Sequence, residues 1–334
     1  MAKFLNNWIF TLVLAVLICV GCKQSNSPVA KDVTQMTFVE LKTDADNGNP
    51  VAQYEMGRRF QEGVGVLKDS SEAVDWWLKA AVQGFPPAEY DLGLAYGRGD
   101  GVPEDKEMGS QWCRRAADAK LPVAEDFEGI AYALGKTSVT QNYSEAFRWF
   151  KLVADQNYPP SQYRLAICYR DGKGTETNVA ESIAWLQCAA SNGLANAQVV
   201  LGKYCVDAGI ISGGIPEKIK PDFPMAKLRT NSDFVRGVEW FQKAANQGNP
   251  DGQIYLGTAY ATGCGIDKDL TEAYKWLMLA STNEPDLVTA LIDRWKTDKI
   301  VFASEQILAG KQRADEFYKT NHFILKSDPE IPGL

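Results

Sequence analysis

One pattern recurs six times along this 334-residue chain, and it limits the folds open to it. A small residue, usually glycine, is followed by an aromatic residue three positions later (two in the fifth copy), by a turn, and then by a tryptophan. The small positions are Gly57, Gly93, Gly129, Ala166, Gly202 and Gly257, spaced by 36, 36, 37, 36 and 55 residues, and the tryptophans are Trp76, Trp112, Trp149, Trp185, Trp240 and Trp276. Six copies in register indicate a repeat architecture.

Each copy predicts a helical hairpin. In the first copy, Ala52, Met56 and Phe60 are spaced as one face of a helix, and the tryptophan with its small neighbours marks a second helix. Gly63 and Gly65 lie between the two and predict a turn. The small positions allow close approach of the two helices, and we expect each tryptophan to fill the core toward the neighbouring hairpin. One hairpin cannot bury its apolar face alone, so the copies are expected to stack.

These residues resemble the Sel1-like (Sel-one-like) repeat family, a relative of the tetratricopeptide repeats. The family pattern A-x-x-x-L-G-x-x-Y, then G-x-G, then A-x-x-W-x-x-x-A-A-x-x-G can be followed over residues 50–283. The resemblance implies an all-α fold: a right-handed superhelical α/α solenoid of about six helical hairpins with capping helices. Lys120 and Glu284 depart from the pattern, because each replaces the glycine expected after a second helix.

The first 21 residues predict a lipoprotein signal peptide. Lys3 precedes a nearly uninterrupted apolar run over residues 8–20, which is shorter than the ~20 residues of a spanning helix. The sequence C-V-G-C that ends at Cys22 resembles a bacterial lipobox, which implies cleavage before Cys22 and lipidation of its sulfur. Lys23 in place of Asp implies sorting to the outer membrane, facing the periplasm. A plain secretory signal, giving a secreted or soluble periplasmic protein, and an uncleaved anchor are the alternatives.

The rest of the chain divides by repeat register. We expect a flexible tether over residues 22–32, an N-terminal capping half-repeat over 33–48, six repeats over 49–283, C-terminal capping helices over 284–320 and a tail over 321–334. The fifth repeat contains 19 extra residues, in an insertion at about 205–232. Long insertions in compact arrays are often functional. The basic residues Lys218, Lys220, Lys227 and Arg229 make it a candidate contact for an acidic partner.

The charge and cysteine content restrict the partners further. The chain has 35 basic and 42 acidic residues, so nucleic acid and anionic lipid are disfavoured, and membrane contact is expected through the lipid anchor only. Cys168 and Cys188 lie on the two helices of one predicted hairpin, which leaves a disulfide open. Burial as free thiols is the favoured interpretation.

No catalytic signature is found. The single histidine is His322. H-E-x-x-H, G-x-S-x-G and S-x-x-K are missing, and C-x-x-C occurs nowhere outside the lipobox-like C-V-G-C at residues 19–22. We therefore predict no catalytic residue, no metal site and no cofactor. The missing S-x-x-K also disfavours β-lactam binding or hydrolysis, an activity assigned to cysteine-rich relatives.

The remaining functional candidate is a surface. The first helices of stacked hairpins are expected to line a concave face, and Tyr and Arg are enriched at binding hot spots. The candidate positions are Tyr54, Arg58, Tyr90, Asp91, Phe127, Tyr163, Arg164 and Tyr255. Packing against the next hairpin is the alternative role for some of these tyrosines.

From this surface and the resemblance we expect a lipid-anchored periplasmic scaffold or adaptor that binds a protein or peptide and is not an enzyme. The family resemblance also implies an alternative: an immunity-type inhibitor that neutralises a secreted toxin such as a phospholipase.

Overall fold

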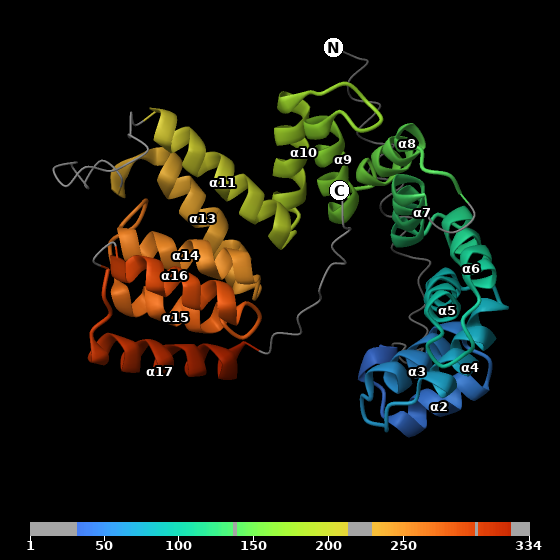
Figure 1. Ribbon diagram of the computed structural model, residues 1–334. Helices are drawn as coiled ribbons and strands as arrows, with labels where there is room; N and C mark the ends of the chain where they lie inside the picture. The colour runs from blue at the N-terminus through green and yellow to red at the C-terminus, as the bar shows by residue number, and fades with distance from the viewer. Residues whose placement is uncertain (1–31, 136–138, 213–228, 298–299, 322–334) are drawn as a thin grey trace, which may run out of the picture. The chain divides into compact units, whose positions relative to one another are not determined.

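The computed structural model describes residues 32–135, 139–212, 229–297 and 300–321 (Figure 1). Within these ranges the regular secondary structure is helical, with 15 α-helices, one short 3-10 helix and no strand. The predicted all-α fold of stacked hairpins is confirmed. None of the described helices is both long and apolar enough to cross a membrane. The predicted signal peptide and Cys22 lie outside the described residues.

The chain forms two compact units, the first ending at Asp105 and the second beginning at Lys106. The first unit contains η1 (Val33–Gln35), α2 (Phe38–Asp46), α3 (Pro50–Glu62), α4 (Ser70–Ala81) and α5 (Pro86–Arg98). α3 and α4 form one hairpin, which packs against α2 on one side and α5 on the other. Arg59 Nη2 donates to the carbonyl of Met36 at 2.8 Å, so α3 also holds the segment before α2 in place.

The second unit repeats the same hairpin. It contains α6 (Lys106–Asp118), α7 (Pro122–Leu134), α8 (Tyr143–Ala154), α9 (Pro159–Asp171), α10 (Val179–Ser191), α11 (Ala195–Ser212), α13 (Ser232–Asn246), α14 (Pro250–Thr262), α15 (Leu270–Ala280), α16 (Pro285–Thr297) and α17 (Ser304–Thr320). The pairs α7–α8, α9–α10, α11–α13 and α14–α15 are hairpins, and α17 packs along α15 (Figure 1). The stretches predicted as C-terminal caps correspond to α16 and α17.

The helix boundaries follow local sequence signals. α3 begins with Pro50 at its first turn and ends at Gly63, whose φ of 74° is a left-handed conformation that glycine adopts without a steric cost. α4 begins after Asp69, whose carboxylate accepts from the backbone N–H of Ser71 at 3.0 Å. At the end of α6, Lys120 itself adopts a left-handed φ of 64°. The turn geometry of the repeat is therefore kept there without a glycine.

In every repeat the residue directly after the repeat tryptophan is buried. Phe150, directly after Trp149, is fully buried, and a Cβ added to Gly129 would lie 2.7 Å from its Cε1 atom. The expectation that each tryptophan fills the core holds for Trp76 and Trp276, which are buried, whereas Trp112 and Trp185 are only half-buried. The small residue at each anchor faces the position after the tryptophan, so that position receives the closest packing.

A lysine covers one face of the repeat indole in several copies. Lys79 Nζ lies 3.6 Å from the ring centroid of Trp76, and Lys243 Nζ lies 4.0 Å from that of Trp240. Each lysine is three residues beyond its tryptophan, on the same helix face. A lysine ammonium stays in contact with water, so the ring that it covers marks the boundary between core and solvent.

The cysteines are free thiols in the described part of the chain. Cys168 and Cys188 are both free, so no disulfide joins them, and of these two only Cys168 is buried as predicted. Burial raises the pKa of Cys168 to about 12, which keeps this thiol protonated and unreactive at neutral pH.

Candidate binding site on the first helices

Some residues predicted to face a partner instead join successive first helices. Arg164 Nη1 on α9 donates to Asp126 Oδ2 on α7 at 2.8 Å, and Ser161 Oγ donates to the other carboxylate oxygen at 2.5 Å. The Arg164 side chain is 9% exposed, so its guanidinium is held inside the second unit. The structure therefore places Arg164 between two helices and not on an open surface.

Tyr54 and Asp91 meet at the equivalent junction of the first unit. The Tyr54 ring packs on Phe85 at 5.5 Å between centroids, and its hydroxyl interacts with the Asp91 carboxylate. Burial, together with the negative charge of Asp91, raises the pKa of Tyr54. Burial also raises the pKa of Asp91 to about 6, although Tyr54 and Arg58 both act to lower it. Asp91 is thus a carboxylate whose ionisation is costly where it lies.

The other predicted aromatic residues are half-buried. Tyr255 stacks on Phe241 with 4.9 Å between ring centroids, and Tyr163 packs against the core cluster around Leu186. Phe127 and Tyr90 are also half-buried, on α7 and α5. Tyr54, Tyr163 and Tyr255 therefore have the alternative role stated for these tyrosines, which is packing against a neighbouring hairpin. Each still presents part of its ring at the surface.

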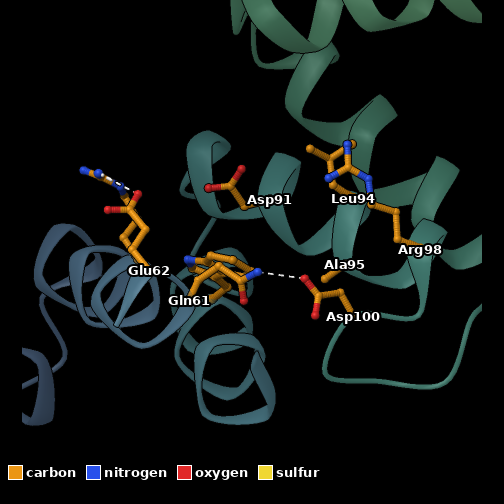
Figure 2. A pocket seen from close by; sticks show the side chains of 9 residues that line it. Gln61, Glu62, Asp91, Leu94, Ala95, Arg98 and Asp100 are labelled. Atoms are coloured by element: carbon orange, nitrogen blue, oxygen red, sulfur yellow. Dashed lines mark hydrogen bonds and ion pairs between the residues drawn. The ribbon is translucent and has the colours of Figure 1, made fainter. Parts of the chain in front are cut away.

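A pocket of about 220 Å³ lies in the first unit, where α3, α4 and α5 meet (Figure 2). It contains two of the predicted positions, Arg58 and Asp91. Its full lining is Arg58, Gln61, Glu62, Trp77, Asp91, Leu94, Ala95, Arg98 and Asp100. Trp77, Leu94 and Ala95 give it an apolar wall, and the other six side chains are polar or charged.

Three of the charged groups in this pocket already have partners within the first unit. Arg58 is ion-paired with Glu62 at 3.0 Å and with Glu55 at 3.3 Å. Asp100 accepts from Gln61 Nε2 at 2.7 Å, drawn as a dashed line in Figure 2. Hydrogen bonds from Ser70 and Gln61 lower the pKa of Asp100.

Like Asp100, which is hydrogen-bonded but not ion-paired, two further charged groups of the pocket have no counterion among the described residues. Asp91 forms no ion pair with any described residue, and neither does the exposed Arg98. The pocket therefore combines a largely buried carboxylate without a counterion and an exposed guanidinium.

The insertion is only partly described. α11 continues to Ser212 and α13 begins at Ser232, so residues of the insertion extend both helices. Lys218, Lys220 and Lys227 lie outside the described residues. Arg229 Nη1 forms an ion pair with Asp267 Oδ1 at 2.7 Å, with both side chains exposed.

A set of six buried polar residues was not predicted. They lie four positions before each small anchor and are Gln53, Glu89, Glu125, Gln162, Gln198 and Gln253. Gln162 is typical: its Nε2 donates to the carbonyl of Ala154 at the end of the preceding hairpin, and its Oε1 accepts from Asn192 Nδ2 at 2.9 Å. These residues hold neighbouring hairpins in register. Their recurrence at one position in all six copies was a signal available in the sequence.

Within the described residues, no group of three or more His, Cys, Asp or Glu side chains could hold a metal ion. The chemistry of the pocket is that of hydrogen bonding and charge pairing. It offers hydrogen-bond donors and acceptors to a ligand, and no histidine, cysteine, serine or lysine is among its lining residues.

A family model for the Sel1 repeat matches six segments of the chain, which together make up more than half of it. They are residues 50–85, 86–121, 129–158, 159–194, 229–249 and 250–283. The resemblance to Sel1-like repeats is confirmed. The segment between the fourth and fifth matches contains α11 and most of the insertion.

Similar proteins share part of the chain. A solved Sel1 repeat protein from Oxalobacter formigenes is 28% identical and superposes with a TM-score of 0.59, covering 76% of this chain and 68% of that one. DAP3-binding cell death enhancer 1 of Rattus norvegicus is 31% identical over 174 residues, which are 44% of this chain. An uncharacterized protein of Neisseria meningitidis serogroup B is 24% identical over 128 residues, or 38% of this chain. The matches span 32% and 22% of the length of these two curated relatives.

Proposed function

The chain belongs to the Sel1 repeat family, and on this premise we propose that it is a lipid-anchored periplasmic scaffold or adaptor that binds a protein or peptide. Sel1 repeats mediate protein–protein interaction, and the rat relative carries the name of a DAP3-binding protein. Neither catalysis nor a cofactor belongs to this function.

The observation that carries the proposal is the composition of the first-helix surface in each unit. Aromatic and charged side chains that are half-buried in the free protein recur there, including Tyr90 and Arg58 in the first unit and Phe127 and Tyr163 in the second. Aromatic residues that are already held in place lose little conformational entropy on binding, so they are efficient contact residues.

Site-specific photo-crosslinking in cells tests this surface. A photoreactive phenylalanine analogue at Phe127 or Tyr163 should form covalent adducts with a partner. The same analogue at Leu152, which is 44% exposed on the second helix α8, should not. Adducts of equal yield from Leu152 would argue against recognition by the first helices. An adduct with a secreted toxin that the protein inhibits would identify an immunity-type inhibitor.

The anchoring part of the proposal rests on Cys22. Cys22→Ser should prevent lipid attachment and release the protein from the membrane fraction, because the preceding apolar run is too short for a spanning helix. A serine variant that remains with membranes would contradict the lipid anchor. The outer-membrane location is tested in the same fractionation by separating the two bacterial membranes on a density gradient.

The insertion is proposed as a second contact, through Lys218, Lys220, Lys227 and Arg229. A variant in which a short Gly-Ser linker replaces residues 213–228 tests this contact. Because α11 continues to Ser212 and α13 begins at Ser232, this replacement leaves both helices intact. We expect the unfolding midpoint to be unchanged and adduct formation from Phe127 to weaken. Unchanged adduct yield would leave recognition to the first helices alone.

A further inference from the structure

We propose that the pocket between α3 and α5 binds a cationic side chain, an arginine or a lysine, of the partner segment, with Asp91 as its counterion. This inference rests on the proposed function as a protein-binding scaffold, and it specifies the chemistry by which the first unit would recognise a partner. It is carried by three features of the pocket: its unpaired carboxylate, its surplus hydrogen-bond acceptor and its apolar wall.

The charge balance of the pocket leaves Asp91 available. Glu62 and Glu55 neutralise Arg58, so this guanidinium is not a full counterion for Asp91. Asp100 is occupied by Gln61 and Ser70. Figure 2 shows that Asp91 takes part in none of the interactions drawn between the lining residues. A cation that enters the pocket would become the counterion of Asp91, which forms no ion pair within the described chain.

The wall of the pocket also contains an acceptor without a donor. Gln61 Nε2 is fixed by its hydrogen bond to Asp100, which sets the orientation of the amide group. The other amide atom, Oε1, is buried and has no hydrogen-bond partner. A guanidinium has five N–H donors in a planar fork, so it can pair with Asp91 and donate to Gln61 Oε1 at the same time more readily than an ammonium can. We therefore expect arginine to bind more tightly than lysine.

The apolar part of the lining suits the stem of such a side chain. Trp77, Leu94 and Ala95 face the same space as the carboxylates. Long cationic side chains bury their methylene groups against apolar surface and keep the charged end at a polar site. Arg98, exposed at the end of α5, has the opposite role, since its positive charge disfavours a cation nearby.

Model compounds test the pocket without a known partner. The full-length protein, labelled with ¹⁵N at its indoles, is titrated with N-acetyl-arginine amide while the Trp77 indole signal is followed by NMR. N-acetyl-lysine amide is the second cation, N-acetyl-citrulline amide is the neutral isostere of arginine, and N-acetyl-glutamate amide is the anion. We expect saturable shifts with arginine, weaker binding of lysine, and no saturable shift with citrulline or glutamate.

Three variants assign the binding to Asp91. Asp91→Asn should weaken arginine binding at least tenfold, and Arg98→Gln should strengthen it, because one removes the counterion and the other a repelling charge. Asp75→Asn removes an exposed carboxylate from α4 in the same unit and should change nothing. Equal binding of citrulline, tighter binding of the glutamate compound, or full arginine binding by Asp91→Asn would each overturn the proposal.

The outcome is separable from that of the proposed function. Adduct formation from Phe127 and Tyr163 reports partner binding in the second unit, whatever the pocket does. Persistent adducts together with a failed arginine titration would reject the pocket alone. Loss of adducts at those positions with intact arginine binding would reject the first-helix surface as proposed and keep the pocket.

Discussion

Arg164 on α9 and Asp126 on α7 form an ion pair of 2.8 Å between two successive first helices, and both side chains are more than nine-tenths buried. Asp126 lies three residues before one small anchor, and Arg164 lies two residues before the next. Tyr54 and Asp91 occupy the same two positions in the first unit. The junction of α7 and α9 therefore contains a carboxylate and a guanidinium, whereas the junction of α3 and α5 contains a carboxylate and a phenol. Asp126 has the Arg164 guanidinium as its counterion, and Asp91 lacks such a group.

Removing one member of the buried pair should destabilise the second unit. Arg164→Met keeps most of the side-chain volume but removes the guanidinium that pairs with the buried Asp126 carboxylate. Breaking a buried pair in this way typically costs about 3–5 kcal/mol. The double variant Asp126→Leu with Arg164→Met should recover much of that loss. Urea denaturation of the wild type, of both single variants and of the double variant would measure the coupling.

An exposed pair of the same unit is the control. Arg148 and Glu145 lie 2.8 Å apart on α8, and the arginine side chain is 74% exposed. Arg148→Met should cost about 1 kcal/mol or less, because water screens exposed pairs. Equal losses for Arg148→Met and Arg164→Met would show that burial of the Asp126 pair contributes nothing to its strength.

A pair of glycine substitutions in the first unit should have opposite signs. A Cβ at Gly57 would meet the Trp77 indole and lie 2.9 Å from the carbonyl oxygen of Ala73, which is backbone and cannot rotate away. Gly57→Ala is therefore expected to destabilise by about 1–3 kcal/mol. Gly97, inside α5, has no atom within 4 Å of an added Cβ. Gly97→Ala should stabilise by about 0.5–1 kcal/mol, because alanine is the better helix former. Thermal unfolding of both variants would test the two signs.

The hairpin fold could be predicted from the sequence because each of its determinants is local. Pro50, Gly63 and Asp69 fix helix ends through backbone geometry that depends on neighbouring residues, and the repeat spacing then fixes which faces pack. The depth of the tryptophans could not be predicted in the same way. Trp149 and Phe150 are adjacent large apolar residues, and only the position of the facing glycine decides which of them is fully buried.

The binding surface was harder to predict for a different reason. Tyr54, Asp91 and Arg164 were selected as variable polar or aromatic residues on first helices, and a sequence cannot show whether such a residue points to solvent or to the next first helix. The distance between successive hairpins decides this. The pocket itself includes Gln61, Arg98 and Asp100, which come from three different places in two repeats, so no local pattern marks it.

In the second unit, the protein should lose more stability when the more deeply buried of two large side chains is replaced by alanine. Phe150→Ala should cost about 3–5 kcal/mol, because the ring is fully buried against Gly129. Trp185→Ala should cost less, although tryptophan is the larger residue, because part of its ring is exposed and Lys151 lies over it at 5.7 Å. Denaturant titrations of the two variants would decide, and a larger loss for Trp185→Ala would contradict the assignment of the deepest position.

The pH dependence of stability should identify Asp91. Its pKa is raised by burial from 3.8 to about 6 in the folded protein, against the combined effect of Tyr54, Arg58 and Arg98 and with a smaller contribution from Glu62 in the same direction. The folded state therefore retains a proton that the unfolded state releases between pH 4 and 6. The contribution of protonated Asp91 is fully present below pH 4 and is lost as the pH rises through 6.

Asp91→Asn removes this titration, since asparagine is neutral at every pH. We expect the variant and the wild type to have equal stability near pH 4, and the variant to be more stable above pH 6 by up to ~3 kcal/mol, because each unit of pKa shift corresponds to about 1.4 kcal/mol. Amide hydrogen exchange in α3 and α5, corrected for the intrinsic rate at each pH, would measure the difference within the first unit. Asp75→Asn, on exposed α4 surface, should show no such pH dependence. A stability gain of the same size at pH 4 and pH 8 would mean that the charge of Asp91 costs the fold nothing, and that its burial does not mark it as a residue kept for a ligand.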